Sequence, residues 1–257
     1  MSERGIAMKG QLVRFEDLPS KGRNYPEDIE IYINPLTVKD QIDMDRLGIS
    51  QAEYFQRALD GITISGNFDK GNLYFYDVQF MDLVRRLYTF DIEEEIMIKD
   101  YPCSNYNCDG KVDCKFKMYQ VEFTDYAEDI FGKSFTFSDG TEVIVEPITV
   151  ANFIKLCRKY MTNKKDKSDS DALLAYYTYC IKDVVGREFK SIDKRNEFLI
   201  DYLGSLTKNK DAKILKKIEV ETSSDIVPFK EICPECGEIV EVRLYPSANF
   251  QQDDTDV

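Results

Sequence analysis

The sequence predicts an α+β fold made of two related strand-plus-helices units, each ending in a zinc-ribbon-like β-hairpin. Three observations lead to this prediction. Short segments that alternate apolar and polar residues are interleaved with longer segments of helical periodicity. A stretch of strand, proline and helix start occurs twice, and two cysteine pairs lie between alternating segments near the middle and the end of the chain. With 257 residues, 43% of them hydrophobic, the chain can bury a large core.

The first unit is expected to open with two strands and a helix. The strands are predicted at residues 11–15 and 30–34, and Pro35 ends the second because proline cannot donate a hydrogen bond to a sheet ladder. Thr37 is the expected N-cap of the helix, with Asp40 three residues further on. The unit therefore begins as strand, strand, helix.

More helices are expected before the first cysteine pair. A capping box that starts at Ser50 predicts a second helix, which Gly61 would end. Residues 61–72 are rich in glycine and asparagine and are expected to form a loop. Beyond this loop, the apolar spacing over residues 80–87 predicts a helix that Asp77 would cap, leading directly to the cysteines.

The second unit is expected to be more helical. A short helix is predicted at residues 124–132, followed by a hairpin over residues 135–145 that turns at Asp139-Gly140. The remaining elements are a helix that starts at Thr149, an apolar helical stripe over residues 173–184 that ends at Gly186, a helix capped by Ser191, and a last helix around Ile218.

The two units share a nine-residue stretch. Residues 30–38 and residues 142–150 carry the same glutamate, proline, threonine and valine at the same offsets. A strand that ends at proline before a threonine-capped helix is a common junction, so chance similarity is the alternative. Because the order of the elements repeats as well, we favour a duplication, with units at residues 1–122 and 123–246. Residues 247–257 form an acidic tail that is expected to be flexible.

Four of the seven cysteines lie in turn-forming sequence and are the candidate metal ligands: Cys103, Cys108, Cys233 and Cys236. The second pair is the more specific, because its two-residue spacer lets both sulfurs face one metal, and Gly237 lets the backbone approach. The first pair has a longer spacer. Two pairs supply the four ligands of a Zn²⁺ ion if the fold brings both turns together. Four thiolates leave no open position for water or substrate, so this zinc would be structural.

The other three cysteines fit positions in the core. Cys157 and Cys180 lie on apolar helix faces, where a free cysteine behaves as a small hydrophobic residue. Cys114 alternates with apolar residues on one strand face and is also expected in the core, with a role as a metal ligand as the alternative. A redox role for Cys233 and Cys236 is a further alternative, although no helix starts after the first of them to lower its pKa.

Composition restricts the classes of function. The formal charge of −13 opposes binding to nucleic acid or to an anionic membrane, so we expect protein partners. No segment approaches about 18 uninterrupted apolar residues, and the N-terminus lacks the apolar segment of a signal peptide, so membrane insertion is not expected. The absence of histidine removes the usual general base and any mixed Cys/His zinc site. The sequence around Gly132 lacks the earlier glycine and the preceding strand of a phosphate loop.

Several features together indicate a family. Leu18-Pro-Ser-Lys-Gly22 is followed by Pro35-Leu-Thr-Val38, and the helix around residues 80–87 leads into a cysteine pair. Residues 232–237 carry the second cysteine pair, and the aromatic Phe250 follows it. In these features the chain resembles the T-even-type bacteriophage baseplate hub family of tail-assembly proteins. It departs from them in the four residues between the first two cysteines, where relatives have two.

The resemblance implies a component of a contractile tail without enzymatic activity. Its partners would be other phage tail and baseplate proteins in a larger assembly, and its location the host cytoplasm during assembly and then the baseplate of the virion. We therefore expect a structural component of the baseplate hub or an accessory in its assembly. The alternatives are a tail-assembly chaperone that is absent from the virion, a zinc-ribbon nucleic-acid adaptor, and an enzyme that uses lysine or carboxylates in place of histidine.

Overall fold

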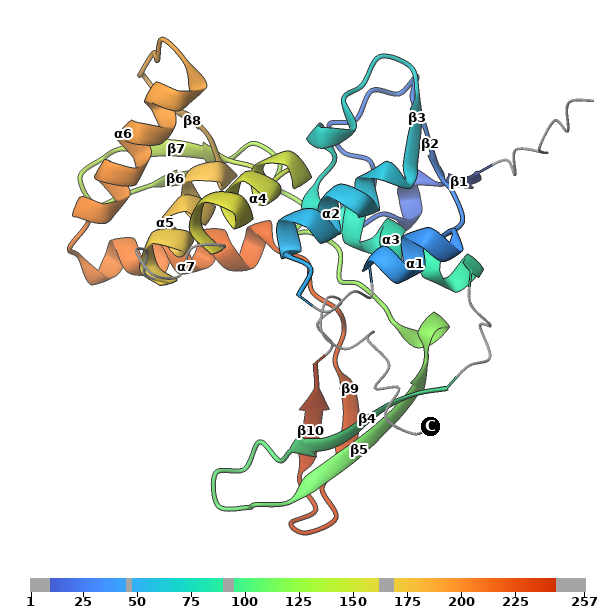
Figure 1. The fold of residues 1–257 in the computed structure, drawn as a ribbon. Helices are drawn as coiled ribbons and strands as arrows, with labels where there is room; N and C mark the ends of the chain where they lie inside the picture. The colour runs from blue at the N-terminus through green and yellow to red at the C-terminus, as the bar shows by residue number, and fades with distance from the viewer. Residues whose placement is uncertain (1–9, 45–47, 90–94, 162–168, 244–257) are drawn as a thin grey trace, which may run out of the picture.

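The computed structural model describes residues 10–44, 48–89, 95–161 and 169–243, so the acidic tail at residues 247–257 lies outside the described residues. Within these ranges the fold is mixed α+β, with seven α-helices and four small antiparallel sheets (Figure 1). The predicted fold class is confirmed at this level. The helices and the two three-stranded sheets make up a body, from which two β-hairpins project.

The first part of the body is a three-stranded sheet with three helices. The strands lie in the order β1-β2-β3, and α1 and α2 come between β2 and β3 in the chain. The bounds are β1 (Gln11–Val13), β2 (Glu30–Ile33), α1 (Val38–Met44), α2 (Gln51–Asp60), β3 (Ile62–Ser65) and α3 (Phe75–Thr89).

Two of the predicted caps are present in this part. The Thr37 hydroxyl accepts from the Asp40 amide at 3.1 Å, and the Ser50 hydroxyl accepts from the Glu53 amide at 3.2 Å. Two predictions are wrong. Residues 61–72, expected to form a loop, contain β3, and Asp77 lies inside the first turn of α3 instead of capping it.

The second part of the body has a similar sheet and four helices. Its strands lie in the order β6-β7-β8, and α4 and α5 come between β7 and β8. The bounds are β6 (Lys133–Thr136), β7 (Glu142–Val145), α4 (Val150–Leu156), α5 (Asp169–Cys180), β8 (Ile181–Val184), α6 (Ile192–Ser205) and α7 (Asn209–Thr222).

The predicted hairpin and caps of this part are confirmed, and two other predictions are wrong. Asp139 accepts from the Thr141 amide in the β6–β7 turn, and Thr149 and Ser191 cap α4 and α6. Residues 124–132 form no helix. The apolar stripe that was expected to stay helical to Gly186 changes at Ile181 into β8, which pairs with β7.

The two parts of the body share one core. The Phe75 amide donates to the Ile148 carbonyl at 3.0 Å, and the Val150 amide donates to the Leu73 carbonyl at 2.8 Å. The rings of Phe75 and Phe153 stack with centroids 3.8 Å apart. The starts of α3 and α4 are therefore held together by backbone hydrogen bonds and by aromatic packing.

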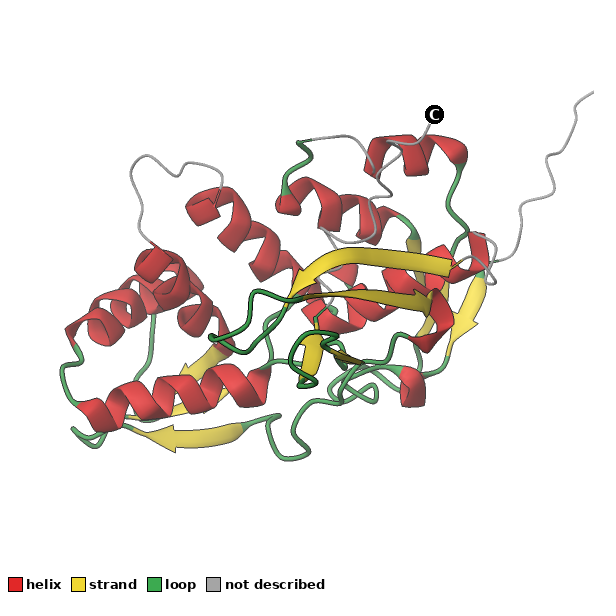
Figure 2. Ribbon diagram, turned by 90° about the horizontal axis from the view of Figure 1, so that it is seen from below, coloured by secondary structure: helices red, strands yellow, loops and turns green. Residues whose placement is uncertain are grey.

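Two hairpins project from the body, and Figure 2 views the molecule from the side on which they lie. They are formed by β4 (Glu95–Pro102) with β5 (Lys111–Lys117), and by β9 (Phe229–Ile232) with β10 (Ile239–Val242). Alternation on β5 turns Val112, Cys114 and Phe116 inward, and the Phe116 ring stacks on Phe229 with centroids 4.7 Å apart. We call these two hairpins the hairpin pair.

None of the helices in the described part of the chain combines the length and the apolar character that crossing a membrane requires.

Candidate metal centre

The turn of each hairpin carries two of the candidate ligands. Cys103 follows β4 and its amide donates to the Gly110 carbonyl at 2.9 Å, which closes the first turn. Cys233 follows β9 and its amide donates to the Glu238 carbonyl, also at 2.9 Å. In both turns the backbone hydrogen bonding of the hairpin thus continues beyond the strands. This continued pairing fixes the direction in which the cysteines project.

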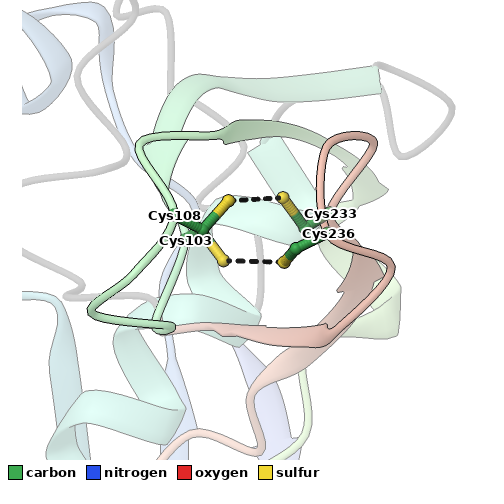
Figure 3. A group of neighbouring side chains, drawn as sticks. All are labelled: Cys103, Cys108, Cys233 and Cys236. Carbon is green, nitrogen blue, oxygen red and sulfur yellow. Dashed lines mark hydrogen bonds between the residues drawn. The ribbon is translucent and has the colours of Figure 1, made fainter.

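The two turns meet, and their four sulfurs converge (Figure 3). The Sγ atoms of Cys103, Cys108, Cys233 and Cys236 all lie within 4.8 Å of one another. Cys103 Sγ lies 3.7 Å from Cys236 Sγ, and Cys108 Sγ lies 3.8 Å from Cys233 Sγ. A tetrahedral zinc with Zn–S bonds of about 2.3 Å requires Sγ–Sγ separations of about 3.8 Å. The four predicted ligands therefore lie close together with a spacing that suits one metal ion.

Backbone amides point at the sulfurs of the first turn. The Asn105 amide donates to Cys103 Sγ at 3.5 Å, and the Gly110 amide donates to Cys108 Sγ at 3.3 Å. A hydrogen bond from a backbone N–H favours a thiolate over a thiol. These two donors therefore offset part of the free-energy cost of deprotonating Cys103 and Cys108, the form of cysteine that binds metals.

Two glycines make room for the site. A Cβ at Gly110 would lie 2.7 Å from Cys233 Sγ and 3.0 Å from Cys108 Sγ, so any side chain there would occupy the space between the sulfurs. Gly237 has a φ of +76°, which L side chains rarely adopt, and its amide donates to the Cys233 carbonyl at 2.9 Å. Both positions thus suit glycine for a local physical reason.

The thiols of Cys108 and Cys233 differ in pKa when no cation lies between the sulfurs. Amide donation from Gly110 lowers the pKa of Cys108, but burial and the neighbouring thiols outweigh it and raise this pKa to about 12. Amide donation from Cys236 and Glu235 lowers the pKa of Cys233 to about 7. A divalent cation at the centre would favour the thiolate form of every sulfur around it.

The other cysteines lie where the sequence predicts. Cys114, Cys157 and Cys180 are buried among apolar residues, and the group of four converging sulfurs does not include them. Burial first, and then the nearby Glu231 carboxylate, raise the pKa of Cys114 to about 11. The prediction that these three thiols are core residues is confirmed.

Sequence reasoning missed a polar contact in the first part of the body. The Ser20 amide and hydroxyl donate to the two carboxylate oxygens of Asp77 at 2.9 and 2.5 Å, and the Tyr25 hydroxyl donates to the same carboxylate at 2.6 Å. Burial raises the pKa of Asp77 to about 6, against the opposing effect of these hydrogen bonds. Since Ser20 and Asp77 lie 57 residues apart, no local pattern indicates the contact.

The second part of the body has the same contact. The Ser138 amide and hydroxyl donate to the two carboxylate oxygens of Asp211, both at 2.7 Å. Each serine lies between the first two strands of its sheet, and each aspartate is the third residue of the helix that precedes a cysteine hairpin. We call these contacts the Ser–Asp clamps.

Comparison with known proteins adds no relative, since no protein-family model, curated protein or solved structure matches the chain. The interpretation of the cysteine group therefore depends on its own geometry and chemistry.

Proposed function

We propose that Cys103, Cys108, Cys233 and Cys236 hold a structural Zn²⁺ ion that locks the hairpin pair. The observation that carries this proposal is the convergence of four thiols from two turns, with facing cysteines 133 and 125 residues apart in the chain. When bound, zinc would supply four metal–thiolate bonds and no open coordination position. The site is therefore structural and not catalytic.

The hairpin pair has a physical need for such a link. No residue of β4 or β9 is buried, and the apolar cluster of the hairpin pair is far smaller than that of the body. An isolated two-stranded hairpin is at best marginally stable in water. Each hairpin contributes two ligands, so neither completes the site alone, and the metal stabilises the pair as one unit.

We propose further that the chain consists of two related units, at residues 1–122 and 123–246, whose hairpins form a zinc ribbon. Both units have a three-stranded sheet in sequential order, two α-helices between the second and third strands, and a helix before the cysteine hairpin. The Ser–Asp clamps at matching positions support the relation, because nothing local requires them. The second unit carries α6 as an additional helix.

For the biological role, we propose a structural component of a contractile phage tail baseplate hub, or an accessory in its assembly. The support is the resemblance in sequence, the absence of histidine, and a net charge of −13, which favours protein partners over nucleic acid. In this role the zinc fixes the hairpin pair, and the outer faces of the protein dock on neighbouring tail proteins.

The metal content of protein purified without added zinc tests the site. We expect about one zinc per chain in the wild type and its loss in both Cys103→Ser and Cys236→Ser, because each turn supplies half of the ligands. Cys157→Ser is the matched control and should retain the metal, since this thiol is buried away from the site. Zinc retained in Cys103→Ser would show that the turns do not share one ion.

Co-expression with the baseplate hub proteins of a T-even-type phage tests the role. We expect the chain to co-sediment with hub intermediates, and to be lost from them in Cys236→Ser if the hairpin pair contributes to docking. Retention on heparin or DNA at moderate salt would favour a nucleic-acid adaptor instead. Turnover of a substrate, lost on a single lysine or carboxylate substitution, would favour an enzyme.

A further inference from the structure

The cysteines of the candidate centre face one another between the hairpins. Figure 3 shows Cys103 opposite Cys236, and Cys108 opposite Cys233. Each facing pair therefore joins the β4–β5 hairpin to the β9–β10 hairpin. In the first turn, amide donors from Asn105 and Gly110 hold each sulfur in this orientation.

The two facing pairs differ in their exposure to solvent. Cys236 is exposed and its partner Cys103 is half-buried, whereas Cys233 is buried and its partner Cys108 is half-buried. A small oxidant from solution therefore reaches Cys236 first. Oxidation of cysteine depends on both accessibility and thiolate character, and ligation to a metal would keep every one of these sulfurs deprotonated.

We propose that hydrogen peroxide oxidises this centre to disulfides that cross between the hairpins, first Cys103–Cys236 and then Cys108–Cys233. Release of the zinc in this process rests on the proposed function. Two cysteines separated by two residues commonly form a disulfide with each other. The facing arrangement of the four sulfurs predicts disulfides between the hairpins instead.

The chemistry balances with peroxide as the only oxidant. The Cys236 thiolate attacks one peroxide oxygen, the O–O bond breaks, and hydroxide leaves and is protonated to water, which gives a sulfenic acid. The Cys103 thiolate then attacks the Cys236 sulfur, the S–O bond breaks, and a second hydroxide leaves and is protonated. Two thiolates thus give two electrons to one peroxide, and two protons are taken up to form two waters.

The disulfides would replace the metal as the link between the two hairpins. After the first disulfide only two thiolates remain, which is half of a tetrahedral ligand set. The metal is lost, but a covalent bond between residues 133 positions apart still holds the hairpins together. The oxidised protein is therefore expected to keep the hairpin pair joined without metal.

Peptide mapping of the full zinc-loaded chain tests the pairing directly. The protein is treated with stepwise additions of peroxide, free thiols are alkylated, and the sample is digested without reduction. Trypsin releases residues 100–111 and residues 231–243 as separate peptides, each with both cysteines of one turn. Disulfides between the hairpins join these two peptides, whereas disulfides within a turn leave them separate and lighter by two hydrogens each.

Further cleavage distinguishes the possible pairings between the hairpins. Chymotrypsin cuts after Tyr106, between the cysteines of the first turn, and an acidic-residue protease cuts after Glu235, between those of the second. At one equivalent of peroxide, we expect the Cys103–Cys236 linkage to be the main product. A chelating dye should detect zinc release in proportion to this linkage. Main products with internal disulfides in separate peptides, or with Cys236 oxidised to sulfinic acid without a linkage, would overturn the proposal.

The order of the two linkages is tested on the intact wild type. The Cys103–Cys236 linkage should form at low peroxide, and the Cys108–Cys233 linkage should appear only after more peroxide is added; the reverse order would contradict the proposal. The buried thiols Cys114, Cys157 and Cys180 are internal controls that should stay reduced throughout. Equal oxidation of these controls and of the facing pairs would contradict the site assignment.

The two proposals fail in different ways. Protein that contains no zinc but forms the Cys103–Cys236 linkage would overturn the proposed metal function and support the redox pairing. Protein that contains about one zinc and forms only disulfides within a turn would overturn the redox pairing and leave the metal function in place.

Discussion

The body and the hairpin pair of this protein are stabilised in different ways. The body buries one large apolar cluster that both three-stranded sheets and most helices share. The hairpin pair has a small cluster, to which α3 of the body contributes Leu83. Burial of apolar surface provides most folding free energy, so the body can be stable without a cross-link. This difference supports the proposal that a metal bound by the four cysteines stabilises the hairpin pair, whose apolar cluster is small.

Removal of the metal should destabilise the hairpin pair more than any other change. Double substitution Cys233→Ser with Cys236→Ser should unfold the hairpin pair and leave the body folded, because structural zinc contributes on the order of 10 kcal/mol to small metal-dependent domains. Hydrogen exchange followed by mass spectrometry should show protection lost in β4, β5, β9 and β10 and retained in β2 and β7. Simultaneous loss of protection everywhere would show that body and hairpins are one cooperative unit.

A smaller loss of stability is expected when either of two buried phenylalanines is replaced by alanine. Phe116 lies in the hairpin pair and Phe137 in the body, and each is 2% exposed. Phe→Ala in a core typically costs about 3–5 kcal/mol. Phe116→Ala also removes the stacking on Phe229, so zinc should pass faster to a competing chelator. Phe137→Ala should lower the melting temperature of the body with little effect on zinc transfer. Equal zinc transfer in the two variants would contradict the division between the regions.

The Ser–Asp clamp of the first unit predicts a pH dependence of stability. Burial raises the pKa of Asp77 to about 6, so the folded state binds this proton more tightly than the unfolded state. The contribution is fully present below the unfolded pKa of about 3.9 and is lost as pH rises through about 6.

Asp77→Asn should remove this dependence. Relative to the variant, the wild type should lose up to about 3 kcal/mol of unfolding free energy between pH 4 and pH 7, since each pKa unit corresponds to about 1.4 kcal/mol. Urea denaturation of both proteins at several pH values measures the difference. A difference that stays constant over this range would contradict the raised pKa.

The smallest expected effect concerns the clamp of the second unit. Ser138→Ala removes the hydroxyl donor to Asp211 and leaves the backbone amide donor in place, which should cost about 1.5 kcal/mol. The exposed Ser134 of β6 provides the control, since Ser134→Ala should change stability by less than about 0.5 kcal/mol. Similar unfolding midpoints for both variants in urea would show that the clamp contributes little.

Local chemistry made much of the fold predictable. Thr37, Ser50, Thr149 and Ser191 act at helix starts because their side chains satisfy amides within three residues. The four converging cysteines could likewise be told apart from the other three, since turn residues surround the four in the sequence and apolar residues surround the others. The fold brings the two cysteine pairs together. In the sequence, only the repeated order of elements indicated that the two pairs would meet.

The errors arose where distant contacts decide the structure. Ile62–Ser65 and Ile181–Val184 are too short for a periodic signal, and each becomes a strand because it pairs with the middle strand of its sheet. The stretch expected to be helical from Thr124 is instead held by long-range backbone hydrogen bonds. The Thr124 amide donates to the Asp225 carbonyl at 2.8 Å, and the Tyr126 amide donates to the Pro19 carbonyl at 3.1 Å. The Asp77 carboxylate is occupied by Ser20 and is not used as a cap.

The absorption spectrum of the cobalt-substituted protein reports whether the two hairpins share one metal ion. Co²⁺ bound by four thiolates in a tetrahedron gives intense visible d–d bands and thiolate-to-metal charge transfer, and both depend on the number of sulfur ligands. We predict the tetrathiolate spectrum in the wild type, a three-sulfur spectrum or no binding in Cys103→Ser and Cys236→Ser, and an unchanged spectrum in Cys157→Ser. A weak octahedral spectrum in the wild type, or an unchanged one in Cys103→Ser, would contradict a single metal shared by the two hairpins.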